Sequence, residues 1–206
     1  MAFFDYLSTK KNSGLAERRR QLRRQYRAAR RALPPYQQYA QAKKLCALLK
    51  RCPEFIHAKS IASYLPSDGE IDPSAIHQLA WSLGKRVYLP VPTQQKSLRF
   101  VPYTSRTQLV TGQWGIQQPR CAGRIATQVS LDLILVPLVA FDNKANRLGR
   151  GGGYYDRFLA SSKRNHSGLK SLGLGHSLQQ VEAVPVEAWD ITLHAIATPR
   201  QIFRSR

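Results

Sequence analysis

Residues 147–157 bring together the groups with which proteins bind phosphate. The segment reads Arg-Leu-Gly-Arg-Gly-Gly-Gly-Tyr-Tyr-Asp-Arg. Glycine lets backbone N–H groups approach an anion closely, and an arginine fork donates paired hydrogen bonds to phosphate oxygens. The pattern is not a Walker A loop, which needs Gly-Lys followed by Ser or Thr, nor a dinucleotide loop, because Tyr154 stands at the sixth position. A flexible loop beside an ordinary strand is the alternative, but the charged and aromatic residues around the glycines favour phosphate binding.

The elements on either side place this loop where an anion site is expected. Residues 133–136 form an apolar run typical of a strand buried on both faces, and Pro137 ends it because proline has no N–H to donate. Residues 154–158 are predicted to open a helix. Strand, glycine loop and helix in this order point the positive end of the helix dipole at the ligand.

Strands and helices alternate along the rest of the chain, which predicts an α/β sheet with parallel strands. Pro102 predicts an edge position for the strand that contains it. No internal repeat or linker divides the chain. The expected helices are 15–33, 36–51 and 74–83, and the expected strands are 60–65, 87–89, 97–103, 133–136, 169–174 and 195–198.

Composition sets broad limits on function. The chain has 206 residues and no apolar run long enough to span a membrane. Its three cysteines show no metal-ligand spacing, which is typical of a reducing cytoplasm. We expect a flexible tail over residues 1–14 and a single domain over 15–206. The net charge of +20 attracts polyanions of any kind.

The expected helix 15–33 carries much of that charge, with eight arginines and no acid between residues 18 and 31. A solvated basic face is one interpretation. Contact with a nucleic-acid backbone is another, although no RNA- or DNA-binding motif accompanies the helix. Charge alone leaves both open.

The decapeptide 147–156, preceded by Pro-Leu-Val-Ala-Phe-Asp, resembles the signature of the 5-formyltetrahydrofolate cyclo-ligase family. Further segments resemble the family in the same order, so that the resemblance spans residues 15–199. They are the basic motif 19–23, the strand-loop pattern from Leu65 to Glu70, the segment 114–119, and Pro-x-Glu-x-Trp-Asp at 185–190.

The resemblance implies a three-layer α/β/α sandwich with a mostly parallel, Rossmann-like sheet in one domain. It also implies an ATP-dependent ligase that closes 5-formyltetrahydrofolate to 5,10-methenyltetrahydrofolate and releases ADP and phosphate. The formyl oxygen would be phosphorylated, after which N10 of the folate would attack the activated carbon. We expect a monomer acting in the cytoplasm, with no membrane partner. The basic surface could also attract a polyglutamylated folate tail.

The resemblance also assigns roles to residues. Arg150 and Tyr154 are the expected catalytic residues, and Asp156 and Asp190 the expected ligands of Mg²⁺. The ATP-binding residues it implies are Arg19, Arg23, Arg147, Leu148, Gly149, Arg150, Gly151, Gly152, Gly153, Tyr154 and Tyr155. The folate-binding residues it implies are Leu65, Glu70, Trp114, Arg150, Gly153 and Tyr154.

Four positions depart from the family pattern. Arg19 and Gly152 stand where relatives have lysine, Gln118 where many have glutamate, and His194 where an aspartate is usual. The alternative function is a non-enzymatic, RNA- or ribosome-associated protein that uses the basic charge.

Overall fold

A seven-stranded sheet forms the centre of the molecule. The computed structural model describes the backbone of residues 2–112, 115–120, 130–165 and 168–205, and the side chains of these ranges from Gly14 onward. The strand order is β11-β10-β9-β6-β1-β2-β3. The strands are β1 Ser60–Ala62, β2 Arg86–Pro92, β3 Leu98–Tyr103, β6 Leu133–Pro137, β9 Lys170–Leu174, β10 Ala195–Ala197 and β11 Ile202–Arg204.

The five inner strands are parallel, and the strand at each edge is antiparallel to its neighbour. The edge position predicted for residues 97–103 is confirmed, since β3 ends the sheet. β11 was not predicted, because three residues after a turn give too short a pattern to recognise.

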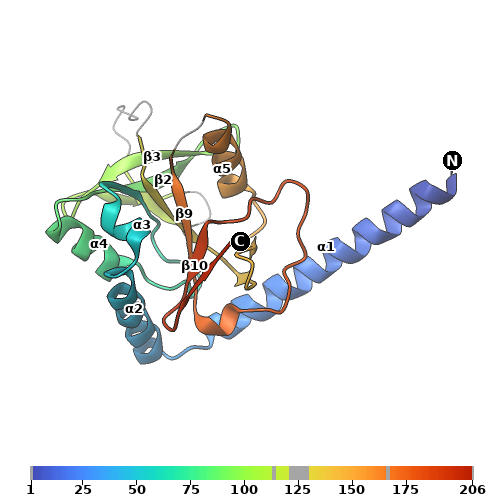
Figure 1. Cartoon of the computed structure of the whole chain (residues 1–206), viewed down its shortest axis with the longest axis horizontal. Helices are drawn as coiled ribbons and strands as arrows, with labels where there is room; N and C mark the ends of the chain where they lie inside the picture. The colour runs from blue at the N-terminus through green and yellow to red at the C-terminus, as the bar shows by residue number, and fades with distance from the viewer. Residues whose placement is uncertain (1, 113–114, 121–129, 166–167, 206) are drawn as a thin grey trace.

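Apolar side chains from successive residues of β6 serve opposite faces of the sheet. Leu133 and Leu135 belong to one core cluster, and Ile134 and Val136 belong to the other. Helices α2 (Pro35–Leu49) and α4 (Ser74–Ser82) pack on the first face, and α5 (Tyr154–Arg164) packs on the second (Figure 1). The expected three-layer α/β/α sandwich is therefore confirmed.

After β1 the chain continues to β2, which lies towards one edge of the sheet. After β6 it continues to β9, which lies towards the other edge. β1 and β6 are neighbours, so a crevice opens between the loops that follow their carboxyl ends. This is the topological switch point, where open α/β sheets bind their ligands. The loop after β1 runs from Ser63 to Ile71. The loop after β6 contains the hairpin of β7 (Ala140–Phe141) and β8 (Arg147–Leu148), followed by the glycines.

Helix α1 (Ala2–Arg31) is longer than expected. The segment for which a flexible tail is predicted, residues 1–14, is helical from Ala2 onward and extends away from the sheet (Figure 1). It contains no proline, and a glycine at position 14 costs a helix only about 1 kcal/mol, which an established hydrogen-bond ladder tolerates.

The expected basic face of α1 is divided. Arg18, Arg20 and Arg24 are exposed, whereas Arg19 and Arg30 are buried against the body of the protein.

The remaining described elements are α3 (Pro53–His57), the 3-10 helix η2 (Ser177–Gln179), and the hairpin of β4 (Leu109–Thr111) and β5 (Gln117–Pro119). No helix in the described part of the chain is long and apolar enough to cross a membrane.

Candidate functional site

A cavity of about 550 Å³ lies at the switch point, between the loops that follow β1 and β6. It is closed on one side by α1 and by the segment between η2 and β10. Among the predicted site residues that the structure describes, Leu148 does not line the cavity, because it is fully buried. Trp114 lies outside the described residues. The predicted site residues that line the cavity are Arg19, Arg23, Leu65, Glu70, Arg147, Gly149, Arg150, Gly151, Gly152, Gly153, Tyr154, Tyr155, Asp156 and Asp190.

The glycine loop leads directly into α5, as the sequence predicts. Gly153 precedes the first helical residue with φ +66°, a left-handed conformation that favours glycine. The helix therefore begins at the cavity, which the residues of its first turn line, and its positive dipole end lies there. Arg157 holds the loop against the β2–β3 turn by donating to the carbonyls of Gly152 and of Lys96, the latter at 2.6 Å.

Three arginines line the cavity together with the glycine loop and the start of α5, and each is held in place by a second group. Arg19 donates to both carboxylate oxygens of Asp190, and its side chain is only 9% exposed. Arg23 Nε donates to the carbonyl of Gly149 at 2.9 Å. Arg147 Nη2 donates to Asp156 Oδ1 at 2.8 Å.

Arg147 has one donor left over. The residue is 5% exposed, and its Nε has no hydrogen-bond partner among the described residues. A buried N–H without a partner costs free energy, so such groups are rare unless a ligand satisfies them. The leftover donor of a cationic group lining the cavity favours an anionic ligand there.

The two expected metal ligands both line the cavity, and both are bound by arginine. Asp190 also accepts from the backbone N–H of Glu187 at 2.9 Å, and Asp156 from that of Ile191 at 3.2 Å. No group of three or more His, Cys, Asp or Glu side chains that could hold a metal occurs within the described ranges. Two carboxylates nevertheless fit Mg²⁺, which takes one or two from a protein and further oxygens from phosphate and water.

Glu70 lies on the opposite wall and is 7% exposed. Its Oε2 accepts from the backbone N–H of Ser67 at 3.2 Å, while its Oε1 lies 3.6 Å from Arg30 Nη2 and 3.9 Å from Arg150 Nη1. Burial raises the pKa of Glu70, and the positive charges of Arg30 and then Arg150 oppose that rise. The result is a carboxylate with two cationic neighbours facing the cavity.

Apolar and aromatic groups line the rest of the cavity. Tyr64 donates its hydroxyl to the carbonyl of Ile71 at 2.8 Å, and burial raises its pKa well above the usual value. Burial likewise raises the pKa of Tyr155, with the charge of Glu70 adding to the effect and Arg147 opposing it. Both phenols are therefore neutral hydrogen-bonding groups at physiological pH. The apolar lining is completed by Leu65, Leu89, Pro90, Pro92, Leu98, Ile116 and Pro137.

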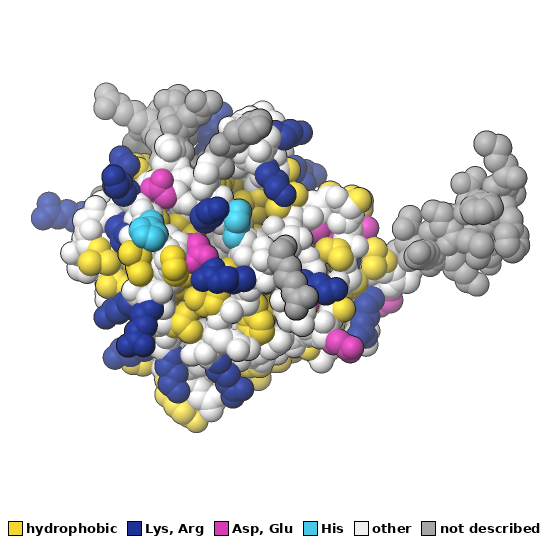
Figure 2. All heavy atoms as spheres, viewed as in Figure 1, with side chains coloured by type: hydrophobic (Ala, Val, Ile, Leu, Met, Phe, Trp, Pro, Cys, Tyr) yellow, Lys and Arg dark blue, Asp and Glu magenta, His cyan; other side chains and the backbone are white. Residues whose placement is uncertain are grey.

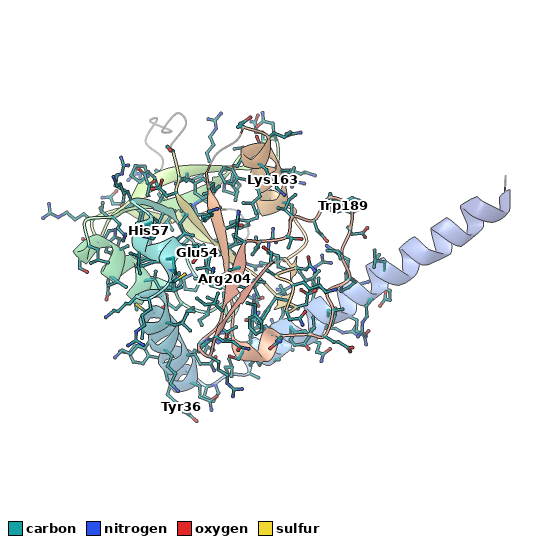
Figure 3. The ribbon with its side chains drawn as sticks, in the orientation of Figure 1. Tyr36, Glu54, His57, Lys163, Trp189 and Arg204 are labelled. Atoms are coloured by element: carbon teal, nitrogen blue, oxygen red, sulfur yellow. The ribbon has the colours of Figure 1, made fainter. Side chains whose placement is uncertain are left out.

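The structure adds residues to which the sequence gave no role. Trp189 lines the cavity although it is 67% exposed, and Figure 3 shows it on the segment that leads to β10. Its position next to Asp190, in the motif at residues 185–190, was the sequence signal that could have indicated a role in the site. Arg30 is one of eight arginines between residues 18 and 31, and it was not singled out from the sequence. The available signal was its spacing of eleven residues from Arg19 and seven from Arg23, which places all three on one helix face. Gln118, one of the four departures, lines the cavity.

Comparisons with known proteins point to one family. The sequence model described as the 5-formyltetrahydrofolate cyclo-ligase family matches residues 15–199. The chain is 38% identical over 180 residues to 5-formyltetrahydrofolate cyclo-ligase of Escherichia coli, covering 86% of this chain and 98% of that protein. It is 38% identical over 183 residues to the Haemophilus influenzae protein of the same name, covering 87% and 97%.

Solved structures agree with the sequence matches. The NMR structure of 5,10-methenyltetrahydrofolate synthetase from Aquifex aeolicus superposes with a TM-score of 0.75 at 30% identity, covering 91% of this chain and 93% of that one. The synthetase from Mycoplasma pneumoniae, at 22% identity and a TM-score of 0.67, shares the fold over 88% of this chain and 98% of that one.

Proposed function

The chain belongs to the 5-formyltetrahydrofolate cyclo-ligase family, and from that premise we propose that it is an ATP-dependent enzyme that converts 5-formyltetrahydrofolate to 5,10-methenyltetrahydrofolate. One observation carries the proposal: a single cavity joins a wall of phosphate-binding groups to a wall with a buried carboxylate and apolar surface. We call these the phosphate wall (Arg19, Arg23, residues 147–156 and Asp190) and the folate wall (residues 64–70, Leu89, Pro90 and Leu98).

The reaction needs no nucleophile from the protein. A formamide oxygen is a poor leaving group, so it first attacks the γ-phosphorus of ATP, and the bond to the ADP oxygen breaks. N10 of the folate then attacks the activated carbon, the phosphate leaves with its oxygen, and the N10 proton is lost. The protein must align two substrates and neutralise charge, which is how phosphoryl transfer is generally catalysed.

The phosphate wall supplies that charge neutralisation. Arg147, with its unpaired Nε, and the N–H groups of residues 149–153 would bind the phosphates. Arg150 is 37% exposed at the cavity mouth, where it donates to Ser67 Oγ at 2.6 Å. It therefore has the freedom to follow the γ-phosphoryl group as charge moves to the formyl oxygen. Gly152 in place of the lysine of relatives leaves this task to the arginines.

Asp156 and Asp190 would hold Mg²⁺ together with phosphate oxygens, and the ion would neutralise the charge that develops on the phosphates. In the structure both carboxylates are bound by arginines. Anionic phosphates entering the cavity would attract Arg19 and Arg147, which would make the carboxylates available to a cation.

The folate wall recognises the pterin ring. A carboxylate accepts two parallel hydrogen bonds from a ring N–H and its neighbouring NH₂, so Glu70 matches that edge of the pterin. Leu65, Leu89 and Leu98, which line the cavity, would cover the ring faces. Tyr154, at the first position of α5, lies where the two walls meet and would donate its hydroxyl to the formyl oxygen.

Trp189 gives the nucleotide base a surface to stack on. It is next in sequence to Asp190 and remains largely exposed, so its ring can meet a purine at little cost. Stacking of a base on an aromatic side chain contributes about 1–3 kcal/mol in other complexes.

The alternative, a basic protein that binds RNA, gains no support from the structure. Arg19, Arg27 and Arg30 form ion pairs with Asp190 and Asp68. Lysine and arginine side chains are dispersed over the visible face rather than gathered in one patch (Figure 2). We propose a monomer that acts in the cytoplasm, where its buried, unpaired Cys46 and Cys52 would stay reduced.

The test is the absorbance of the methenyl product when the protein meets 5-formyltetrahydrofolate, Mg²⁺ and ATP. We expect product only with ATP, and little from Asp156→Ala that has been shown to fold by circular dichroism. Absence of product from folded parent protein, with RNA binding that falls steeply with salt, would replace the proposal with the alternative.

A further inference from the structure

Arg30 is the most deeply buried cation of the site, although it does not line the cavity. It lies in the last turn of α1 and has no solvent exposure. Nε donates to the carbonyl of Asp68 at 2.7 Å, Nη1 to the carbonyl of Leu138 at 3.0 Å, and Nη2 to Asp68 Oδ2 at 2.9 Å. These acceptors belong to the loops after β1 and after β6. The guanidinium of Arg30 therefore links the loop after β1 to the loop after β6.

The turn that presents Glu70 rests on this arginine. Residues 67–70 form a turn closed by a hydrogen bond from Glu70 N to Ser67 O at 3.1 Å, with φ values of +56° at Asp68 and +73° at Gly69. Positive φ at both central residues is the pattern of a type I′ turn, for which Asp-Gly is a preferred sequence. A Cβ on Gly69 would lie 3.0 Å from the backbone oxygen of Arg30, so the turn and the helix end are in close contact.

Glu70 has two cationic neighbours with different freedom. Arg150 is partly exposed and lies in the loop proposed to follow the phosphoryl group. Arg30 is immobilised by three hydrogen bonds, and its Nη2 is 3.6 Å from Glu70 Oε1. The other charged or titratable groups around Glu70 are Asp68 in the same turn, Tyr64 after β1 and Tyr155 on α5. Among the described residues around Glu70, Arg30 alone supplies a fixed positive charge that the reaction does not need elsewhere.

We propose that Arg30 is a positioning residue for folate binding, which keeps Glu70 in place and ionised while Arg150 moves to the phosphoryl group. The proposal rests on the proposed function. Without Arg30, the buried carboxylate would lose its permanent counter-charge, and its pKa would rise further. The affinity for folate would then fall, whereas ATP, bound on the phosphate wall, would be affected little.

The experiment compares Arg30→Gln, which keeps a donor without charge, with Arg30→Lys, which keeps the charge. We expect Arg30→Gln to raise KM for 5-formyltetrahydrofolate by about 10- to 100-fold, the range for a lost hydrogen bond to a charged group. KM for ATP should stay within about threefold, because ATP does not contact Glu70. Arg30→Lys should recover most of the folate affinity. Arg27→Gln is the matched control, since Arg27 also binds Asp68 but has no contact with Glu70.

A double-mutant cycle with Glu70→Gln separates positioning from a general structural role. A neutral amide needs no counter-charge, so Arg30→Gln should raise the folate KM much less in that background. The affinity of Arg30→Gln for folate, measured by direct binding, should recover as pH rises, because a carboxylate with a raised pKa ionises at higher pH.

Equal increases in both KM values, or an undiminished effect in the Glu70→Gln background, would overturn the proposal. Should Arg30→Gln not fold, the cycle is run with Arg30→Lys. An increase in its folate KM that the KM for ATP shares, or that persists undiminished in the Glu70→Gln background, would overturn the proposal. A parent protein that binds no folate would refute the proposed function instead.

Discussion

The two walls of the cavity come from equivalent places in the fold but are built differently. The folate wall follows β1, and its turn at residues 67–70 is held by Arg30 and by the buried side chain of His176, which contacts the carbonyl of Gly69 at 3.2 Å. The phosphate wall follows β6, and its glycines 151 and 152 are exposed. Arg23 and Arg157 hold the backbone of this loop at Gly149 and Gly152, and the arginine–aspartate pairs join further side chains.

The difference matches what each wall is proposed to bind. A fused ring has a fixed outline, so a preorganised wall binds it at the lowest entropic cost. A phosphoryl group changes its charge and its bonds during the reaction, and a partly exposed side chain such as Arg150 has the freedom to follow it. We therefore expect changes in the phosphate wall to alter rates more than stability, and changes beneath the folate wall to alter stability as well.

Replacement of Arg150 by alanine should have the largest effect. Turnover is expected to fall by about 100-fold or more, the cost of removing one hydrogen-bond donor to developing charge. Because Arg150 is partly exposed and bonded only to a serine hydroxyl and a more distant carboxylate, the melting temperature should hardly change. Steady-state kinetics and thermal denaturation measure both, and unchanged turnover would remove Arg150 from the mechanism.

Low pH should destabilise the folded protein, because His176, which supports the folate wall, is buried as a neutral ring. Burial lowers the pKa of His176 to about 4, the Gly69 carbonyl opposes the shift, and Arg30 adds to it. The folded state thus favours the neutral ring. Its contribution to stability is complete above the unfolded pKa of about 6.5 and is lost as pH falls towards 4, roughly 3 kcal/mol in all.

Urea unfolding between pH 7 and pH 4 measures this loss. His176→Gln should reduce the slope of stability against pH, whereas His57→Gln, which alters an exposed histidine, should leave it unchanged. Equal slopes in the parent protein and His176→Gln would contradict the prediction. His77 also has a pKa lowered to about 4 by burial, so part of the slope should remain.

Gly69→Ala should destabilise the protein by about 1–3 kcal/mol, the usual cost of a strained backbone conformation. The matched control is Gly84→Ala. Gly84 has a similar φ of +68° but no atom within 4 Å of an added Cβ, whereas an added Cβ on Gly69 meets the backbone of α1. The melting temperature of Gly69→Ala should therefore fall further. Equal shifts would show that backbone strain alone, without contact with α1, determines the cost.

Trp189→Ala should have the smallest effect. We expect KM for ATP to rise about 5- to 10-fold, near the lower end of the range for base stacking, with stability unchanged because the ring is largely exposed. Trp189→Phe should retain most of the affinity. ADP should quench tryptophan fluorescence in the parent protein and less in Trp189→Phe. Equal quenching would place the base elsewhere.

The sequence by itself determined the family and the layout of residues 147–156 of the phosphate wall. Strand, glycine loop and helix are encoded by neighbouring residues, and Arg147, Arg150 and Asp156 are fixed in register by the same short segment. Local patterns also gave most strands and helices and the edge position of β3, because hydrophobic periodicity and proline placement act over a few residues.

Only the tertiary structure decided what depends on distant partners. Residues 120 or more apart in the chain form the Arg19–Asp190 and Arg23–Gly149 contacts, and no local pattern distinguishes Arg19 and Arg30 from the exposed arginines of α1. The burial of a charged residue depends on the groups that surround it after folding, since a charge is stable inside a protein only where it is paired. That is why a helix that reads as uniformly basic proves to have one face that supports the site and another that faces solvent.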